Sequence, residues 1–406
     1  MSTKTTYIQT ELGLIPEDWE VKKLGECSSI SGDYGINAPA VKFSEDLPTY
    51  LRITDIDDDG NYSKENKVSV KDDNSESFIL DDEDIVFART GATVGKTYLH
   101  NKKENGDLVF AGFLIRFRTN FDILLPYYLK LYTNTDKYWN WVSVFSMRSG
   151  QPGINSKEYS NLKIPLPPLA EQKKIADCLS TWDSAIEKQN ALINALTDRK
   201  KALMQQLLTG KKRLPGFEGK WELKSIEELF TFKNGKAHEN VIDENGKYIL
   251  INSKYISTNG DVLKKTNSNL APLEVNDLVF VMSDVPNGKA LAKFFLVDEN
   301  DLYTLNQRIG LLKVKNGNPA FMYYLLNRNS YFLTFDNGVG QTNLRKDDIL
   351  DCPLNIPSLS EQTAIAEILA TADRELQLQK EKLVQLQQQK KGLMQVLLTG
   401  KKRLLN

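Results

Sequence analysis

Two stretches of 46 residues, 169–214 and 359–404, align without a gap at an offset of 190. The first reads LAEQKKIADCLSTWDSAIEKQNALINALTDRKKALMQQLLTGKKRL, and the second reads LSEQTAIAEILATADRELQLQKEKLVQLQQQKKGLMQVLLTGKKRL. Of the 46 aligned positions, 23 are identical, and both stretches close on Leu-Leu-Thr-Gly-Lys-Lys-Arg-Leu. This identity is far above chance, so the chain contains an internal duplication.

Each repeat places apolar residues in alternating steps of four and three, which is the 3.5-residue period of a coiled-coil seam. The seam residues are Ile175, Leu179, Ile186, Ile193, Leu196, Leu203 and Leu207, and Ile365, Leu369, Leu376, Leu383, Leu386, Leu393 and Leu397. Polar residues interrupt the two seams at matching points, Gln189 with Gln379 and Lys200 with Lys390. Such interruptions fix the register of a coiled coil at some cost in stability. The pattern predicts one long helix in each repeat, in preference to a helix buried in a single core.

The ends of both predicted helices carry boundary signals. Pro168 and Pro357 precede the repeats, and Gly210 and Gly400 suit a left-handed residue at the helix C-terminus. Two similar amphipathic helices far apart in the chain can bury their seams most economically against each other. An antiparallel pair would give the chain an approximate internal two-fold axis.

The segments before the helices also correspond, but only at landmarks. The landmark pairs are Trp19 with Trp221, Asp84-Ile-Val-Phe87 with Asp277-Leu-Val-Phe280, Gly95-Lys96 with Gly288-Lys289, Tyr127-Tyr128-Leu129 with Tyr323-Tyr324-Leu325, and Gly150-Gln151 with Gly340-Gln341. Short β-branched and aromatic runs between Gly and Asn residues predict strands and turns, so each segment is expected to be a mixed α/β domain. The expected order is a first domain at 1–168, a first helix at 169–214, a second domain at 215–358 and a second helix at 359–406.

Composition sets limits on the class of protein. A chain of 406 residues with 41% hydrophobic and 26% charged residues is expected to form at least two globular domains. No apolar run is long enough to span a bilayer, and the N-terminus lacks a signal-peptide pattern, so we expect a cytoplasmic protein without a membrane partner. The net charge of −1 argues only weakly against nucleic acid, because binding requires a basic face and not a basic average. The three cysteines lie far apart without metal-ligand spacing, so neither a disulfide framework nor a zinc site is expected.

The helix entries Ile164–Gln172 and Ile356–Gln362, the long helices and the LLTGKKRL exits resemble the specificity subunit of type I restriction-modification systems. The resemblance implies two α/β target-recognition domains separated by a long antiparallel two-helix coiled coil. It also implies that the domains read a bipartite, asymmetric target in double-stranded DNA. By the same resemblance, the helices would dock two adenine methyltransferase subunits, which in turn recruit motor endonuclease subunits.

The sequence contains no recognisable catalytic constellation. Gly91-Ala-Thr-Val-Gly95-Lys96-Thr97 is similar to a phosphate-binding loop but has three residues between its glycines, where the Walker A pattern requires four. There is no methyltransferase tetrapeptide, no HExxH, and the two histidines, His100 and His238, are isolated. We therefore expect no enzyme activity, no cofactor and no metal.

Direct reading of bases in DNA relies on Arg against guanine and on Asn or Gln against adenine. The candidates, which include phosphate-contacting residues on glycine turns, are Arg89, Thr90, Lys96, Arg148, Gln151, Asn155, Lys289, Gln307, Arg308, Gln341, Asn343 and Arg345. Two alternatives remain open: a coiled-coil scaffold that joins two protein-binding modules, and the recognition subunit of another type of restriction enzyme. Near-identical helices with divergent domains favour recognition, since one docking surface would then serve two different targets.

Overall fold

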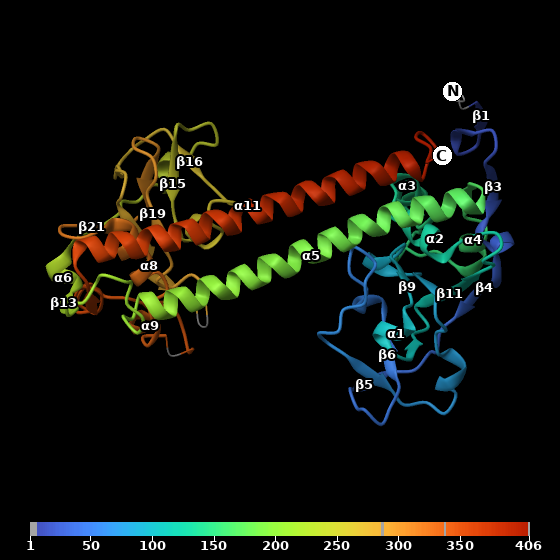
Figure 1. Cartoon of the computed structure of the whole chain (residues 1–406), viewed down its shortest axis with the longest axis horizontal. Coiled ribbons are helices and arrows are strands. Elements are labelled where there is room, and N and C mark those ends of the chain that lie inside the picture. Colours follow the sequence, from blue (N-terminus) through green and yellow to red (C-terminus); the bar gives the residue numbers. More distant parts are fainter. Residues whose placement is uncertain (1–5, 286–287, 337, 405–406) are drawn as a thin grey trace. The chain divides into compact units, whose positions relative to one another are not determined.

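A computed structural model describes residues 6–285, 288–336 and 338–404 (Figure 1). The chain forms two compact units. One is built from two separate parts of the sequence, and the other from its middle. The first unit contains the residues up to Asn190 together with those from Lys382 onward, and the second contains Ala191–Glu381. None of the helices in the described ranges combines the length and the apolar character that crossing a membrane requires.

The first unit contains twelve of the described strands. They are β1 (Tyr7–Thr10), β2 (Gly13–Pro16), β3 (Glu20–Lys23), β4 (Ser28–Tyr34), β5 (Ala40–Lys42), β6 (Thr49–Leu51), β7 (Val68–Val70), β8 (Ile85–Ala88), β9 (Thr97–Leu99), β10 (Leu108–Phe110), β11 (Leu114–Thr119) and β12 (Lys163–Leu166). Its short α-helices are α1 (Lys102–Asn105), α2 (Pro126–Tyr132), α3 (Asp136–Phe145) and α4 (Ser156–Ser160), and the long helix α5 (Leu169–Leu207) begins in this unit.

The second unit follows the same plan. Its strands are β13 (Glu222–Ser225), β14 (Phe230–Asn234), β15 (Tyr248–Ile251), β16 (Lys265–Thr266), β17 (Leu278–Val281), β18 (Ser283–Asp284), β19 (Phe294–Leu296), β20 (Tyr303–Leu305), β21 (Ile309–Val314), β22 (Thr342–Asn343) and β23 (Pro353–Ile356). Its helices are α6 (Ile226–Leu229), α7 (Ser253–Ser257), α8 (Pro319–Leu326), α9 (Ser330–Leu333) and α10 (Lys346–Leu350), and the long helix α11 (Leu359–Leu397) begins here.

Sheet topology repeats between the units, which extends the duplication from the helices to the whole chain. A four-stranded antiparallel sheet has the order β4-β11-β8-β9 in the first unit and β14-β21-β17-β19 in the second. A smaller sheet contains a parallel pair in both units, β6 with β10 and β15 with β20. A two-stranded ribbon, β3 with β12 or β13 with β23, leads into each long helix. The expected mixed α/β fold with an internal duplication is confirmed.

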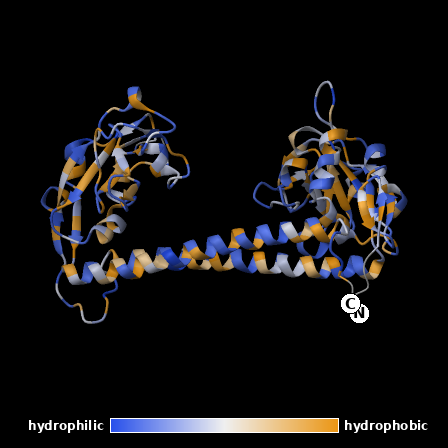
Figure 2. Ribbon diagram, turned by 90° about the horizontal axis from the view of Figure 1, so that it is seen from above, coloured by the Kyte–Doolittle hydropathy of each residue, from blue (hydrophilic) through white to orange (hydrophobic). Residues whose placement is uncertain are grey.

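The central strands β8 and β17 are apolar at every position because both faces of the sheet are covered. In β8, Ile85 and Phe87 face the core formed with α2 to α4, while Val86 and Ala88 face the smaller sheet. The second unit uses β17 in the same way. Figure 2 shows this apolar content as hydrophobic colour gathered on the strands, whereas the long helices have mixed colours.

The long helices pair antiparallel within each unit. In the second unit Arg199 pairs with Glu375 and Lys200 with Asp373, and in the first unit Lys390 pairs with Asp183. Eight of the fourteen seam residues are buried and the other six are half-buried, so none faces solvent fully. The two seam lysines are therefore not simple interruptions, since each forms an ion pair with the facing helix.

The same Asp residues also receive a tyrosine from the adjoining domain. Tyr127 of α2 donates its hydroxyl to Asp183, and Tyr324 of α8 donates to Asp373 at 2.7 Å. Burial and the neighbouring carboxylate raise the pKa of both tyrosines well above the usual range. Each domain is thereby fastened to the helix pair through a shared aspartate.

In each unit a residue near the start of one repeat pairs with a residue near the end of the other, in a cluster that we call the clasp. Arg403, from the end of the second repeat, pairs with Glu171 at the start of α5, and Trp19 donates its indole N–H to Glu171 at 3.0 Å. In the second unit, Arg213, Glu361 and Trp221 form the same contacts. The entry glutamate and the exit arginine of the repeats are thus partners, and the tryptophan landmark completes the clasp.

One landmark pair is positioned differently from its sequence match. Both α2 and α8 begin with proline, and Gln172 and Gln362 accept the N–H of the residue just before that proline. Pro126 therefore corresponds to Pro319, and the Tyr-Tyr-Leu motifs lie about one turn apart on equivalent helices. The sequence match at this point is wrong because Tyr127 and Tyr324, from successive turns of equivalent helices, donate to the equivalent Asp183 and Asp373.

Candidate nucleic-acid interface

Most of the predicted DNA-contacting residues meet at one edge of the four-stranded sheet in their own unit. In the first unit β4 ends, β11 begins and β8 ends at this edge, as the pairs Tyr34 with Ile115 and Ala88 with Leu114 show. The second unit has the corresponding ends of β14, β21 and β17. We call this the strand-end edge. Residues from three separate stretches of sequence meet there because antiparallel neighbours turn at the same side of a sheet.

In the first unit, Arg89 occupies the strand-end edge directly after β8. Its guanidinium lies 4.8 Å from the centre of the Tyr34 ring, and its backbone N–H donates to Phe113 at 3.0 Å. The Tyr34 hydroxyl in turn accepts the backbone N–H of Ser156. The arginine is therefore held by an aromatic face, and both Tyr34 and Phe113 are exposed beside it.

A loop from the end of the domain joins this edge. Thr90 forms a bridge with Gly153, and the N–H of Gly91 donates to Pro152. Gly91 has φ +72°, and a Cβ there would lie only 3.1 Å from Nε2 of Gln151. Gln151 is thus exposed at the same edge as Arg89 and Thr90, although it is far from both in sequence.

The loop from Gly91 to Lys96 does not form a phosphate cradle. The N–H groups of Val94, Gly95 and Lys96 all donate to nearby backbone carbonyl oxygens. The Lys96 ammonium pairs with Asp58 at 2.6 Å and is half-buried. This loop therefore uses its backbone donors internally, and the acidic run Asp57-Asp58-Asp59 lies next to a predicted DNA-contacting lysine.

Two further candidates in the first unit have structural partners. Arg148 makes two hydrogen bonds to Glu158, at 2.6 and 2.7 Å, and donates to the carbonyl oxygen of Phe145. Asn155 caps α4 by accepting the N–H of Glu158 at 2.9 Å. The structure explains both residues without DNA.

In the second unit, the connection after β17 is organised by a carboxylate. Asp284 accepts the N–H groups of Val285, Ala290 and Leu291 at 2.7 to 3.1 Å. These N–H groups therefore bind the carboxylate of Asp284. Lys289 is exposed on the same connection. Residues 286 and 287, just before the Gly288-Lys289 landmark, lie outside the described residues. Gln307 and Arg308 form the exposed turn between β20 and β21.

The remaining candidates of the second unit share one face. Gln341, Asn343 and Arg345 are exposed, while Thr342 and Leu344 between them are buried. This alternation is that of an extended strand, and β22 pairs with β18 at the strand-end edge. Together with Phe335, these three residues line a surface hollow of about 390 Å³.

The exposed aromatic residues at this edge were not predicted. Phe145 and Phe335 stand at the same offset of 190 as the helical repeats, each five residues before the glycine of the Gly-Gln landmark, and both are exposed. The repeat could have revealed them in the sequence. Tyr34 and Phe113 carry no such signal, because their neighbourhood depends on strands that are distant in sequence.

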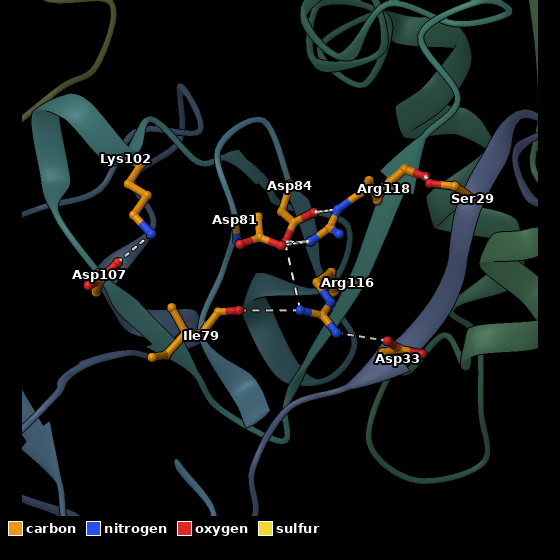
Figure 3. A network of polar contacts seen from close by, with 9 residues as sticks. All are labelled: Ser29, Asp33, Ile79, Asp81, Asp84, Lys102, Asp107, Arg116 and Arg118. Carbon is orange, nitrogen blue, oxygen red and sulfur yellow. Dashed lines mark hydrogen bonds and ion pairs between the residues drawn. The ribbon is translucent and has the colours of Figure 1, made fainter. Parts of the chain in front are cut away.

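Of the acidic residues between β7 and β8, Asp84 is neutralised inside the fold. Asp84 is fully buried and accepts from Arg118 at 2.7 and 2.9 Å, while Arg116 also reaches Asp33 and the carbonyl of Ile79 (Figure 3). The hydrogen bonds to Asp84 raise the pKa of Arg118. In the second unit Asp277 caps the equivalent turn and faces Lys313. These carboxylates fix the turn before the central strand, which explains the shared Asp landmark.

Within the described part of the chain no metal-ligand cluster is found, and Cys27 and Cys352 are buried thiols. Residues 6–285, 288–336 and 338–404 contain no group of three or more His, Cys, Asp or Glu side chains arranged to hold an ion. Burial raises the pKa of Cys27 to about 11 and that of Cys352 to about 12, so both stay protonated at neutral pH.

The fold and the strand-end edge define a class: a duplicated α/β protein whose two domains share a framework and a helix pair but differ at their exposed edges. Residues 16–198 and 218–388 each match the type I restriction modification DNA specificity domain. The chain belongs to this family of type I restriction-modification specificity subunits.

Similar proteins support the assignment along the chain. The type I restriction enzyme MjaVIII specificity subunit of Methanocaldococcus jannaschii is 28% identical, and the alignment covers 97% of this chain and 95% of that protein. The EcoDI specificity subunit of Escherichia coli is 29% identical over 44% of this chain and 37% of its own length.

Solved structures share the fold at low identity. The HsdS subunit from Thermoanaerobacter tengcongensis has a TM-score of 0.51 at 16% identity, covering 97% of this chain and all of that one. The S subunit of a type I system from M. genitalium has a TM-score of 0.57 at 16% identity, covering 93% of this chain and 96% of that one. A chain from a structural study of type I complex assembly has a TM-score of 0.58 at 16% identity, covering 96% of this chain and 99% of its own.

Proposed function

We propose that this protein reads a bipartite, asymmetric DNA target, with one half-site contacted by the strand-end edge of each unit. The paired helices would dock two adenine methyltransferase subunits, and motor endonuclease subunits would join through them. The protein would act in the cytoplasm, where the DNA and these partners are found.

One observation carries the proposal: the two units are alike where they hold the helices and different where they could meet DNA. The seam and the glutamate and arginine of the clasp recur at an offset of 190, whereas the strand-end edges differ. Arg89 of the first unit has Met282 at its equivalent place, since each precedes the residue that bridges to the Gly-Gln loop. A common helix surface with two different edges suits one kind of partner and two different half-sites.

The family assignment favours recognition over the alternatives of a scaffold or of another restriction type. Within the proposal the chain itself is not an enzyme, because its loops direct their backbone donors inward and its sequence has no catalytic motif. Purified alone, it should neither methylate DNA, hydrolyse ATP nor cleave DNA.

Methylome sequencing of the host with and without this gene tests the function. We expect a split adenine-methylation motif that disappears on deletion and returns on complementation. A methylation pattern that is unchanged by deletion, in a host with active partner genes, would refute the proposal.

The candidate residues can be tested in the same assay. Arg89→Ala should relax the sequence of one half-site, and Arg308→Ala that of the other, because each removes a potential guanine reader at about 1–3 kcal/mol of discrimination. Arg148→Lys is a suitable control, since the structure assigns Arg148 to Glu158. If both half-sites keep their sequence in the Arg89 and Arg308 variants, these residues do not read bases.

A further inference from the structure

The hollow of the second unit combines an aromatic ring with groups that recognise the edges of bases. It is lined by Phe335, Gln341, Thr342, Asn343, Arg345 and Asp348, together with Val339 and Gly340. Phe335 is 36% exposed and lines the hollow, while its ring also contacts that of Tyr331.

Phe335 is held in place and is not a loose surface residue. Its backbone N–H donates to Phe332, which is fully buried, and its ring contacts that of Tyr331 at 5.5 Å between centres. The next residue, Asp336, accepts both the N–H of Gly338 and the hydroxyl of Thr342. Asp336 thereby connects the segment that carries the Phe335 ring to β22, which carries Asn343.

The polar groups of the hollow suit a base better than a phosphate. Gln341 and Asn343 each offer an amide donor and acceptor, and Arg345 offers several donors. Asp348, which accepts the backbone N–H of Arg345 at 2.8 Å, adds a carboxylate. A carboxylate repels phosphate but accepts hydrogen bonds from the exocyclic amino groups of bases.

The first unit has the same aromatic residue but a different surrounding. Phe145, at the offset of 190 from Phe335, stacks on Trp141 at 4.9 Å and is 43% exposed. There Arg148 donates to the carbonyl oxygen of Phe145 and to Glu158, which stands at the same offset from Asp348. The residue of the second unit that corresponds to Arg148 is Gly338, which has no side chain that could join Phe335 to Asp348.

We propose that the hollow of the second unit holds one nucleobase displaced from the DNA stack. The base stacks on Phe335, and its edge meets Gln341, Asn343, Arg345 and Asp348. This inference rests on the proposed DNA-reading function and adds a distortion of the DNA by the specificity subunit, separate from the extrusion of the methylated adenine by the partner.

The proposal predicts an unusual response to mismatches. Displacing a base from a matched duplex requires breaking its pair, and this cost falls when the base is already mismatched. A mismatch that keeps the displaced base but replaces its partner should therefore tighten binding, by about tenfold. At positions that are read inside the duplex, a mismatch should weaken binding.

The experiment uses the complex of this protein with its methyltransferase and duplexes of the target identified by methylome sequencing. Dissociation constants are measured by fluorescence anisotropy with a mismatch at each position of both half-sites in turn. We expect tightening at one position other than the methylated adenines, and its loss in Phe335→Ala together with about tenfold weaker binding to matched DNA. Phe335→Trp should retain the tightening because it keeps an aromatic face.

Three controls separate the possible outcomes. Tightening by mismatches at the methylated adenines reports the partner and should be unchanged in Phe335→Ala. Phe121→Ala, which alters an exposed phenylalanine of the first unit outside the strand-end edge, should change neither response.

If the complex binds and methylates its target but no other position shows tightening, or if the tightening survives Phe335→Ala, the displaced base is refuted and DNA recognition stands. If the complex has no sequence preference, the proposed function itself fails.

Discussion

At the scale of single residues, the clasp shows why a few charged positions recur in both halves of the chain. Arg403 and Glu171 are 7% and 5% exposed, and Arg403 also pairs with Asp18 at 2.8 Å. The hydrogen bonds from Arg403 hold the pKa of Asp18 below its usual range. A buried ion pair of this kind is costly to break because the remaining charge has no partner.

Arg403→Ala should destabilise the first unit by about 3–5 kcal/mol, since it leaves Glu171 buried without its guanidinium. Denaturant unfolding followed by tryptophan fluorescence measures this. The double variant Arg403→Ala with Glu171→Gln should recover part of the loss, because the uncompensated charge is gone. Arg213→Ala in the second unit should cost less, as Arg213 is 28% exposed. An Arg403 variant as stable as the parent would show that the clasp does not stabilise the unit.

His100 should give the first unit a dependence on pH. Burial lowers its pKa, so the native state favours neutral imidazole while the unfolded chain takes up a proton near its ordinary value. Its contribution to stability is therefore full above about pH 6.5 and is lost as the pH falls below that value. The melting temperature should drop less between about pH 7.5 and about pH 5.5 in His100→Gln than in the parent. Equal drops in the two proteins would contradict this assignment.

At the scale of elements, each long helix belongs partly to one unit and partly to the other, so both helices take part in both domains. The start of α5 and the end of α11 belong to the first unit, and the end of α5 and the start of α11 belong to the second. The seam residues are buried or half-buried along both helices, while the residues between them are mostly exposed. The helices can thus bind each other through one face and offer the other to a partner.

Leu196→Asp combined with Leu386→Asp should disrupt the pairing in both units and prevent assembly with the methyltransferase. Leu196 is 7% exposed, so an unpaired carboxylate there should cost several kcal/mol. Size-exclusion chromatography of the mixed subunits measures assembly. The matched control is Ala195→Asp with Gln385→Asp, which adds the same charges at exposed neighbouring positions. Normal assembly of the seam variant would mean that docking does not depend on this pairing.

At the scale of the whole molecule, the first unit is completed by the end of the chain. Met394, Leu397 and Leu398 lie in the same core as Ile175 and Leu179. The equivalent residues at the end of α5, Met204, Leu207 and Leu208, are identical. The first half of the chain therefore carries a copy of the segment that closes its own domain.

A fragment of residues 1–214 should form a homodimer in which the end of each α5 closes the partner's domain. Its Arg213 would take the place of Arg403 beside Glu171. Analytical ultracentrifugation should show a dimer at micromolar concentration, and Arg213→Ala should shift it toward monomer. With methyltransferase present, the dimer should recognise a palindrome of the first half-site. A folded, monomeric fragment would contradict this exchange.

The sequence by itself determined the duplication, the two long helices and the landmark residues of the domains. It could do so because a 3.5-residue period and an identical exit motif are local patterns, which are legible without knowing what packs against them. The same local logic indicated the α/β character of each domain. It also paired Asp84 with Asp277, whose shared role is to fix a turn.

Only the tertiary structure decided which candidates share an edge and which are occupied elsewhere. Arg89 and Gln151 are far apart in sequence and meet because β8 and the loop before α4 end at one side of a sheet. Arg148 and Asn155 look like DNA-contacting residues in the sequence but bind Glu158. The hollow beside Phe335 is bounded by an aromatic ring, by side chains of β22 and by the start of α10, which only the folded chain brings to one space. The physical reason is that helical periodicity is set within one segment, whereas a binding surface is set by side chains from segments that only folding brings together.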